Sequence, residues 1–137
     1  MAAYLKFQQF VEDLGLKLHD LNTDQFMVYL TNNAPSVSAD AVLADLVGIT
    51  EENGYAAADI LNTFSQTGGV GTFAGTDKVW TASGGTFGPF RYAVIRNETQ
   101  ISPLKPLVAY YDYGAEITVQ DGYPFTVNFG SNVFTLT

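Results

Sequence analysis

The sequence predicts an α+β fold that is mainly β: an antiparallel β-sandwich or barrel with an N-terminal amphipathic helix. Two observations lead to this prediction. Apolar residues recur at three- and four-residue steps between Tyr4 and Leu21, which is the period of a helix. From Gln25 onward the period changes to two, and short apolar or aromatic runs alternate with turn residues over the second half of the chain.

The N-terminal helix is expected to bury one apolar face. Gly15 interrupts its pattern and costs about 1 kcal/mol relative to alanine. The segment is therefore expected to break there into a helix and a continuation. Seven side chains form the apolar face: Tyr4, Phe7, Phe10, Val11, Leu14, Leu18 and Leu21.

A buried strand is expected next, over Gln25–Thr31, because its residues are almost all apolar. Asn and Pro in Asn32–Pro35 predict that a loop ends this strand. Residues Ala39–Val47 are expected to form a short helix or helical turn, with Ser38 as its N-terminal cap. The dipeptide Asn53-Gly54 predicts a turn.

From Ile60 to Gly75 the pattern weakens, and this glycine-rich segment is expected to be either a mobile arm or a loosely specified edge strand. Six further strands are expected after it, separated by turn residues. In the fifth of them, Phe125, Val127 and Phe129 should face the core. The six segments are Lys78–Thr81, Gly88–Asn97, Pro106–Asp112, Ala115–Val119, Tyr123–Phe129 and Val133–Thr137.

The length of 137 residues predicts a single domain over 1–137. Within it we expect a helix-containing part over about 1–60, a flexible glycine-rich segment over about 62–76 and a β-rich part over about 77–137. The N-terminus lacks a basic region followed by a continuous apolar run, so neither a signal peptide nor a membrane span is expected.

Charge and cysteine content exclude several function classes. The chain has 14 acidic and 6 basic residues, a net charge of −8, and its bases are not clustered. Such a surface repels phosphate backbones, so no nucleic-acid partner is expected. The chain contains no cysteine, which excludes disulfides, thiolate chemistry and cysteine-bound metals.

The residues that could carry chemistry are few. The only histidine, His19, is expected to be a cation at the C-terminal end of the helix, where it would complement the dipole. The run Gly68-Gly69-Val70-Gly71 lacks the Lys-Ser/Thr of a phosphate loop and is interpreted as a flexible loop. No catalytic, cofactor-binding or metal-binding residue is predicted, and no cofactor.

Three acids leave one enzymatic alternative open. Asp112, Glu116 and Asp121 lie on separate predicted turns, and solvated turn acids are the favoured interpretation over a glycosidase pair or a calcium site. We therefore expect a protein that is not an enzyme. A depolymerase that uses Asp112 or Glu116 is the alternative, to be tested by changing each residue to alanine.

With no predicted site for catalysis, a surface that binds another molecule is the function that the sequence supports. Tyrosine and tryptophan are enriched at interfaces, although strand alternation places Tyr110 and Tyr111 on opposite faces, so part of this set must be core. The segment Gln66–Gly75 is expected to be a contact arm, together with the N-terminal region. The candidate interface residues are Trp80, Tyr110, Tyr111, Tyr113, Tyr123, Gly68, Gly69 and Gly71.

The order of several segments resembles a group of small structural proteins of tailed bacteriophages. The most distinctive are G-P-F-R-Y and D-Y-G. The segments are F-x-x-F-V-E-D-L (Phe7–Leu14), M-V-Y-L-T-N-N-A-P (Met27–Pro35), A-D-A-V-L-A-D-L (Ala39–Leu46), N-G-Y (Asn53–Tyr55), W-T-A-S-G-G-T-F-G-P-F-R-Y-A-V (Trp80–Val94) and P-L-V-A-Y-Y-D-Y-G (Pro106–Gly114).

This resemblance implies a virion protein, made in the host cytoplasm and located on the capsid surface. The implied role is that of a decoration (cement) protein, which binds the major capsid protein from outside and stabilises the head. A homo-oligomer, with a trimer as the first guess, or copies ordered by the lattice would be expected, without nucleic-acid or membrane partners. The alternative is a tail, neck or head-fibre component that acts as a host-surface binding module.

Overall fold

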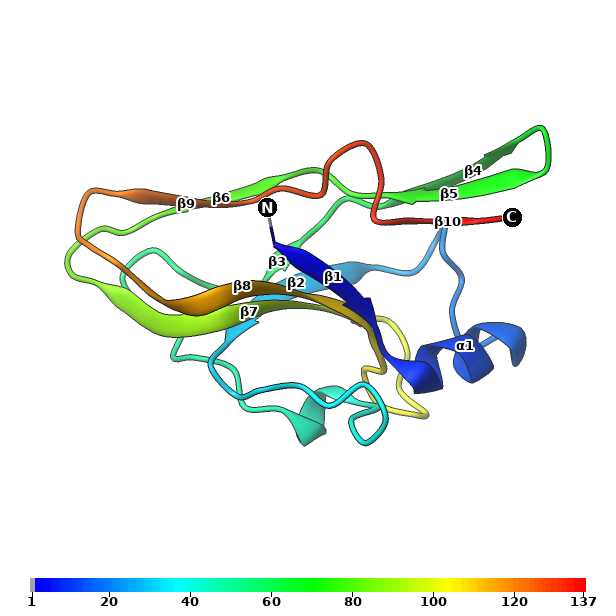
Figure 1. Ribbon diagram of the computed structural model, residues 1–137, viewed down its shortest axis with the longest axis horizontal. Helices are drawn as coiled ribbons and strands as arrows, with labels where there is room; N and C mark the ends of the chain where they lie inside the picture. Colours follow the sequence, from blue (N-terminus) through cyan, green and yellow to red (C-terminus); the bar gives the residue numbers. More distant parts are fainter. Residues whose placement is uncertain (1) are drawn as a thin grey trace.

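Two layers of antiparallel β-strands form the body of the molecule in the computed structural model, which describes residues 2–137 (Figure 1). The fold is mainly β with one α-helix, as the sequence predicts. One layer is a five-stranded sheet in the order β1 (Ala3–Lys6), β8 (Leu107–Val119), β7 (Phe87–Asn97), β2 (Phe26–Thr31) and β3 (Ala58–Asp59). The other layer contains a three-stranded sheet, β10 (Phe134–Leu136), β5 (Val70–Ala74) and β4 (Thr63–Thr67), and a two-stranded sheet, β6 (Lys78–Thr81) and β9 (Pro124–Val127).

The long hairpin of β7 and β8 is the centre of the fold. Its strands pair from Phe87↔Val119 to Arg96↔Leu107, and Ala93, Val94 and Ile95 are fully buried. The sequence predicted two strands with a Tyr113-Gly114 turn between them, and this is wrong. Because β7 continues past this point, both segments pair with it and form one strand, β8, whose extra residues bulge between the pairs Tyr92↔Asp112 and Phe90↔Ile117.

The N-terminal helix is shorter than predicted. Only Gln8–Gly15 is helical (α1), whereas Ala3–Lys6 is a strand paired with the edge of β8 through Tyr4↔Tyr111. After Gly15 the chain turns through Lys17, whose φ is 70°, so the predicted continuation to Leu21 does not form. A helical period and a strand period fit Tyr4 equally well, and the sheet edge supplies hydrogen bonds that an exposed first helical turn would lack.

Residues Ala39–Val47 contain a helical turn, one of the two expected alternatives, rather than a short α-helix. Only a 3₁₀ turn, η1 (Leu43–Asp45), is present, and Asp45 rather than Ser38 accepts the hydrogen bonds from nearby backbone N–H groups. The segment is held instead to the end of the β7–β8 hairpin, because Leu43 N–H donates to the Lys105 carbonyl. These long-range bonds replace the local bonds of a helix.

Two alternatives were predicted for the glycine-rich segment, a mobile arm or an edge strand, and the structure has the edge strand. It folds into the β4–β5 hairpin, which turns at Gly68-Gly69 with positive φ at both residues. β4 is the outermost strand of its sheet and is mostly exposed, and the hairpin extends beyond the rest of its layer (Figure 1). Gly71 is an exception to this exposure, because it is buried under the ring of Phe64.

Aromatic side chains fill the space between the layers, as the composition predicts. The rings of Phe26 and Phe73 meet edge to face at 5.1 Å, and those of Phe90 and Phe125 at 4.8 Å. Helix α1 closes one end of the sandwich, where Phe10 packs on Phe134 at 5.5 Å. Across residues 2–137, none of the helices is long and apolar enough to span a membrane.

Candidate binding site

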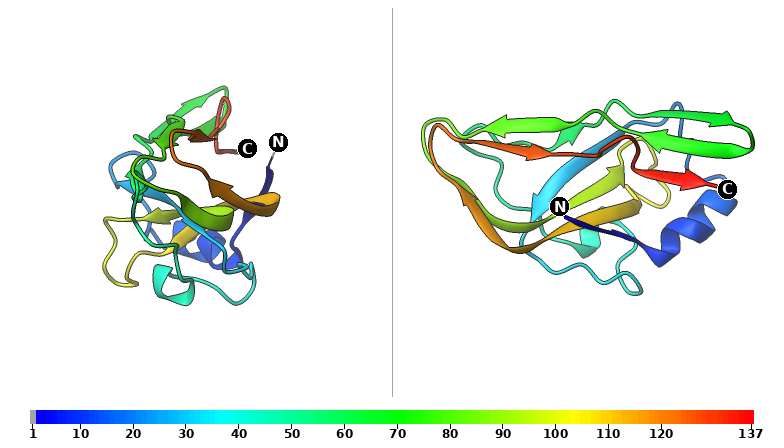
Figure 2. Two further views of the ribbon diagram at one scale, coloured as in Figure 1. Left: turned by 90° about the vertical axis from the view of Figure 1, so that its left-hand side faces the viewer. Right: turned by 45° about the horizontal axis from the view of Figure 1, so that its top comes forward.

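The two layers do not meet along one flank of the sandwich. β1 is the edge of the five-stranded sheet, and β9 and β10 are the corresponding edges of the opposite layer. In the end view of Figure 2, β1 and the C-terminus lie on this flank. We call the space between these edges the edge groove; it contains two hollows.

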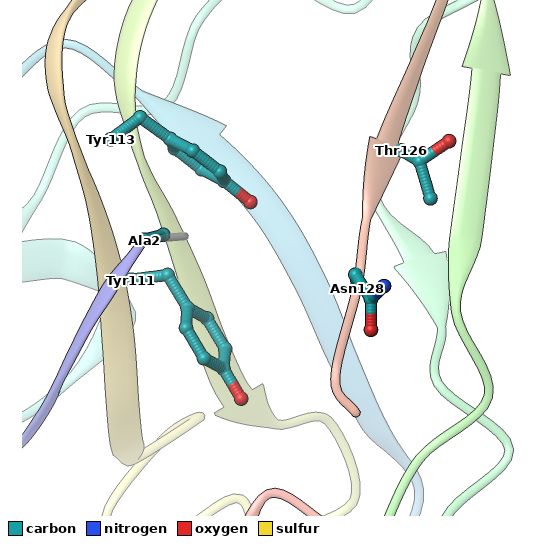
Figure 3. Close-up of a pocket in the computed structure, with 5 residues that line it drawn as sticks. All are labelled: Ala2, Tyr111, Tyr113, Thr126 and Asn128. Atoms are coloured by element: carbon teal, nitrogen blue, oxygen red, sulfur yellow. The ribbon is translucent and has the colours of Figure 1, made fainter. Parts of the chain in front are cut away.

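The first hollow lies between β8 and β9 and has a volume of about 410 Å³. Tyr111 and Tyr113 project from β8 toward β9, where Thr126 and Asn128 form the opposite side of the lining (Figure 3). Tyr111 and Tyr113 share one face of β8 because they are two positions apart. This face is the inner one, since the ring of Tyr111 packs against Phe129 of the other layer. Ala2, just before β1, completes the lining.

The second hollow lies between β1, α1 and β10 and has a volume of about 320 Å³. It is mostly apolar. Tyr4 links it to the first hollow, because its ring lies 5.6 Å from the ring of Tyr111. The residues that line it are Tyr4, Lys6, Phe10, Val11, Leu14 and the strand β10.

Tyr111 is the most unusual side chain of the groove. Only 7% of its surface is exposed, and its hydroxyl is buried without a hydrogen-bond partner in residues 2–137. Its ring packs against Phe129 at 5.9 Å. A buried hydroxyl without a partner costs about 1–3 kcal/mol, so the edge of the first hollow holds an unused donor and acceptor.

The tyrosines of the groove are neutral. Burial raises the pKa of Tyr4 to about 12 and that of Tyr113 to about 12, and it also raises the pKa of Tyr111. All three hydroxyls therefore keep their protons at physiological pH. They can donate hydrogen bonds to a ligand without adding charge.

The backbone also presents free groups to the groove. Phe7 N–H donates a hydrogen bond to Val108 O. Because alternate residues of an antiparallel strand point their backbone groups toward the same neighbour, Leu5 and Ala3 also direct their N–H and C=O groups to β8. The N–H and C=O groups of Tyr4 and Lys6 consequently face away from β8, into the open flank. The same alternation, starting from the bond between Ala82 N–H and Tyr123 O, directs the backbone of Thr126 away from β6.

The groove differs in charge from the rest of the chain. Among residues 2–137, none of those that line the two hollows is acidic, and the only charged one is Lys6. Lys6 forms no salt bridge with any residue in 2–137, whereas Arg91, Arg96 and Lys105 are all paired. In a chain of net charge −8, this is a neutral to weakly positive surface.

The predicted interface residues are divided by the structure. Tyr111 and Tyr113 line the first hollow of the groove, whereas Trp80 and Tyr110 are buried core residues that line neither hollow. Trp80 donates through Nε1 to Ala56 O at 2.8 Å, and Tyr110 packs on Phe7 at 5.4 Å on the other face of β8.

The remaining predicted residues lie outside the groove. Tyr123 is 66% exposed at the turn before β9. Gly68 and Gly69 form the exposed tip of the β4–β5 hairpin, and Gly71 is buried.

The sequence interpretation missed Tyr4, Lys6, Thr126 and Asn128 as groove residues. Tyr4 was assigned to a helix, which hid the alternation that places it with Lys6 on one face of a strand. Thr126 and Asn128 were expected to be exposed, and they are, but nothing local to them indicates that β8 lies opposite. Strand order is a long-range property that the sequence pattern does not contain.

Two of the three acids considered for catalysis, Asp112 and Asp121, accept hydrogen bonds from other parts of the fold. Asp112 accepts two hydrogen bonds from Arg91, at 2.8 and 3.1 Å, and this pairing lowers the pKa of Asp112. Asp121 accepts a hydrogen bond from Gly84 N–H at 3.2 Å, and Glu116 is exposed on β8. Among residues 2–137, no three histidine, aspartate or glutamate side chains gather where they could hold a metal ion.

His19 does not have its predicted role. It lies beyond the end of α1, is buried, and its Nδ1 accepts a hydrogen bond from Asn97 Nδ2 at 3.0 Å. Burial lowers the pKa of His19, although Asp13 and Asp24 oppose the shift. The side chain is thus a neutral core residue rather than a cation at a helix end.

Comparison of the chain with protein-family models, with curated proteins and with solved structures finds no match.

Proposed function

We propose that this chain is a non-enzymatic structural protein of a tailed-phage virion: a decoration protein that binds the outer surface of the major capsid lattice and stabilises the head. The observation that carries the proposal is the edge groove. It combines unpaired strand edges with one hydroxyl-rich and one mostly apolar hollow, and such edges are usually blocked in proteins that act alone. A surface of this kind suits adhesion to another subunit.

The resemblance supports the proposal from a different part of the molecule. Trp80–Val94 covers the last two residues of β6 and most of β7, and Pro106–Gly114 covers the part of β8 that pairs with β1. The resembling segments thus supply most of the central hairpin, including Tyr111 and Tyr113 of the groove. The strands β1, β9 and β10 lie outside them.

The β4–β5 hairpin is a second candidate contact. Its tip projects from the sandwich and holds exposed Val70 beside Gly68 and Gly69. A projecting hairpin with little core of its own can follow the surface of a neighbouring subunit. The base of this hairpin is different, because Phe73 is buried and paired with Phe134.

Copy number is the direct test of location. Quantitative gel densitometry of purified virions should give a copy number close to that of the major capsid protein. A handful of copies per particle would contradict the decoration role. That result would favour the tail, neck or head-fibre alternative, in which the hydroxyl-rich first hollow would contact carbohydrate.

Binding is tested separately with bare heads that lack the protein. Added protein should bind them and raise the temperature at which they release DNA. A variant that removes residues 67–70 and joins Gln66 to Gly71 through Asn-Gly shortens the hairpin without touching Phe73. Undiminished binding and full heat protection by this variant would exclude the hairpin tip from the interface.

A further inference from the structure

We propose that the edge groove takes one extended segment of a second protein, which adds a strand to the free edge of β1. The segment carries apolar side chains at alternate positions and has a neutral or negative charge. This inference deepens the proposed function, on which it rests only for the identity of the partner. The occupant is deduced from backbone, shape and charge in turn.

The backbone of β1 requires a strand. Tyr4 and Lys6 direct their N–H and C=O groups into the open flank, at the spacing of a β-ladder. All four residues of β1 are exposed, and the strand contains no proline or bulge that would block pairing. A segment in extended conformation matches these groups along its whole length, whereas a helix has free backbone N–H and C=O groups only at its ends.

The hollows require alternation in that segment. Directly opposed residues of paired strands lie on the same face. Residues opposite Ala2, Tyr4 and Lys6 would therefore direct their side chains into the groove, toward the first hollow at one end and the second at the other. Intervening residues would face solvent. Apolar side chains at the inward positions would cover the tyrosine rings.

Tyr111 is an independent indication of a ligand. Its hydroxyl is buried and unpartnered in residues 2–137, and it points across the first hollow toward β9 (Figure 3). Native proteins rarely bury such a group without a partner. A polar group of the added segment supplies that partner.

Charge selects the partner. The lining of the groove carries only the unpaired cation Lys6, so a segment with an acidic residue beside it is favoured over a basic one. A second copy of this chain is disfavoured as occupant, because each copy brings a net charge of −8. We therefore assign the groove to an arm of a different protein.

The test adds the proposed strand to the full chain as an N-terminal extension that can pair with β1. An extension of about six residues joins Ala2 through an Asn-Gly turn, which closes a two-residue hairpin with β1. It places valine at the inward positions beside Ala2 and Tyr4, glutamate beside Lys6, and threonine between them. The control extension has the same composition shifted by one residue, so that its valines face solvent.

The inward-facing extension should raise the melting temperature by about 5 °C and slow hydrogen exchange of the Tyr4 and Lys6 amides by about tenfold or more. The shifted control should give less than half of both effects. Equal effects of the two extensions would refute the alternation, and no slowing with either would refute strand addition. The variant Lys6→Glu should lose part of the gain, and an unchanged gain would refute the charge assignment.

Two further outcomes separate the occupants. If the unmodified chain forms dimers by sedimentation and its Tyr4 amide is protected, the occupant is a second copy and the assignment to another protein is wrong. If the extension behaves as expected while virions hold only a few copies of the protein, the groove stands and the decoration role fails. The inference and the proposed function can therefore fail separately.

Discussion

Replacing Tyr111 with phenylalanine tests whether its hydroxyl is unused in the free protein. The ring contacts with Tyr4 and Phe129 remain in Tyr111→Phe, while a buried polar group without a partner is removed. Relief of that desolvation should stabilise the free protein by about 1 kcal/mol, which raises the melting temperature by about 4 °C in a chain of this length. Most substitutions at buried positions do the opposite.

The assay is urea denaturation at pH 7, with the same substitution at Tyr110 as the matched control. Tyr110 lies on the opposite face of β8 and is equally buried, but its hydroxyl is not among the unpartnered buried groups. Tyr110→Phe should change the free energy of unfolding by less than about 0.5 kcal/mol. Tyr111→Ala, which also removes the ring, should cost about 3–5 kcal/mol.

A loss of more than about 1 kcal/mol in Tyr111→Phe would mean that the hydroxyl is already satisfied within the fold. The reasoning about the first hollow would then be wrong. The same variant should bind the added strand less well than the natural chain does, because the partner's polar group loses its acceptor and donor. Stabilisation of the free form with weakened binding is the combination that distinguishes a binding group from a structural one.

Three further substitutions test other parts of the account. Arg91 lowers the pKa of Asp112, so the stability that ionised Asp112 contributes is present above its unfolded pKa of about 3.9 and is lost as pH falls through the folded pKa. Because the pair is partly exposed, Asp112→Asn should lower the free energy of unfolding by at most about 1 kcal/mol at pH 7. A loss that persists below pH 2 would contradict this linkage. The pKa of His19 is also lowered in the folded protein, so the free energy of unfolding should fall as pH drops below about 6.5. His19→Phe should flatten the dependence of the free energy of unfolding on pH between about pH 6.5 and 5. An unchanged dependence in urea titrations of the variant would refute the role of His19. At Gly54, where φ is 93°, an added Cβ would collide with the carbonyl of Thr81, whereas Gly84 has a similar φ but open space around it. Gly54→Ala should therefore destabilise the protein by at least about 2 kcal/mol more than Gly84→Ala. Equal losses of stability in the two variants would contradict the contact with Thr81.

The strands were predictable because their signals are local. Lys78–Thr81 forms a strand with the predicted bounds, and β2 differs by one residue from the expected segment. In both cases turn residues flank a short run of β-forming side chains. Phe125, Val127 and Phe129 turn toward the interior as their alternation indicates, with Val127 and Phe129 fully covered.

The errors arose where a distant segment decides the local structure. Tyr4 belongs to a strand because β8, about a hundred residues later in the chain, offers a free edge. Tyr113-Gly114 does not turn because β7 pairs with the residues on both sides. Neither partner is visible in a window of ten or fifteen residues.

The candidate site was half predictable for the same reason. Tyr111 and Tyr113 were named from their residue type, although Tyr113 was expected in a turn rather than on the same strand. Their neighbours Tyr4 and Lys6 come from a strand that the helical period concealed, and Thr126 and Asn128 from the opposite layer. The groove exists only because two sheet edges remain apart, and that property belongs to the topology rather than to any segment.

Hydrogen exchange on bare phage heads tests the central claim most directly. The exchange of backbone amides is measured by mass spectrometry for the free protein and for the protein bound to purified heads that lack it. We expect slower exchange, by about tenfold or more, in the peptides that contain Tyr4 and Lys6 of β1 and Thr126 of β9. Binding with unchanged exchange in these peptides would contradict the role of the edge groove, and failure to bind the heads would contradict the decoration function itself.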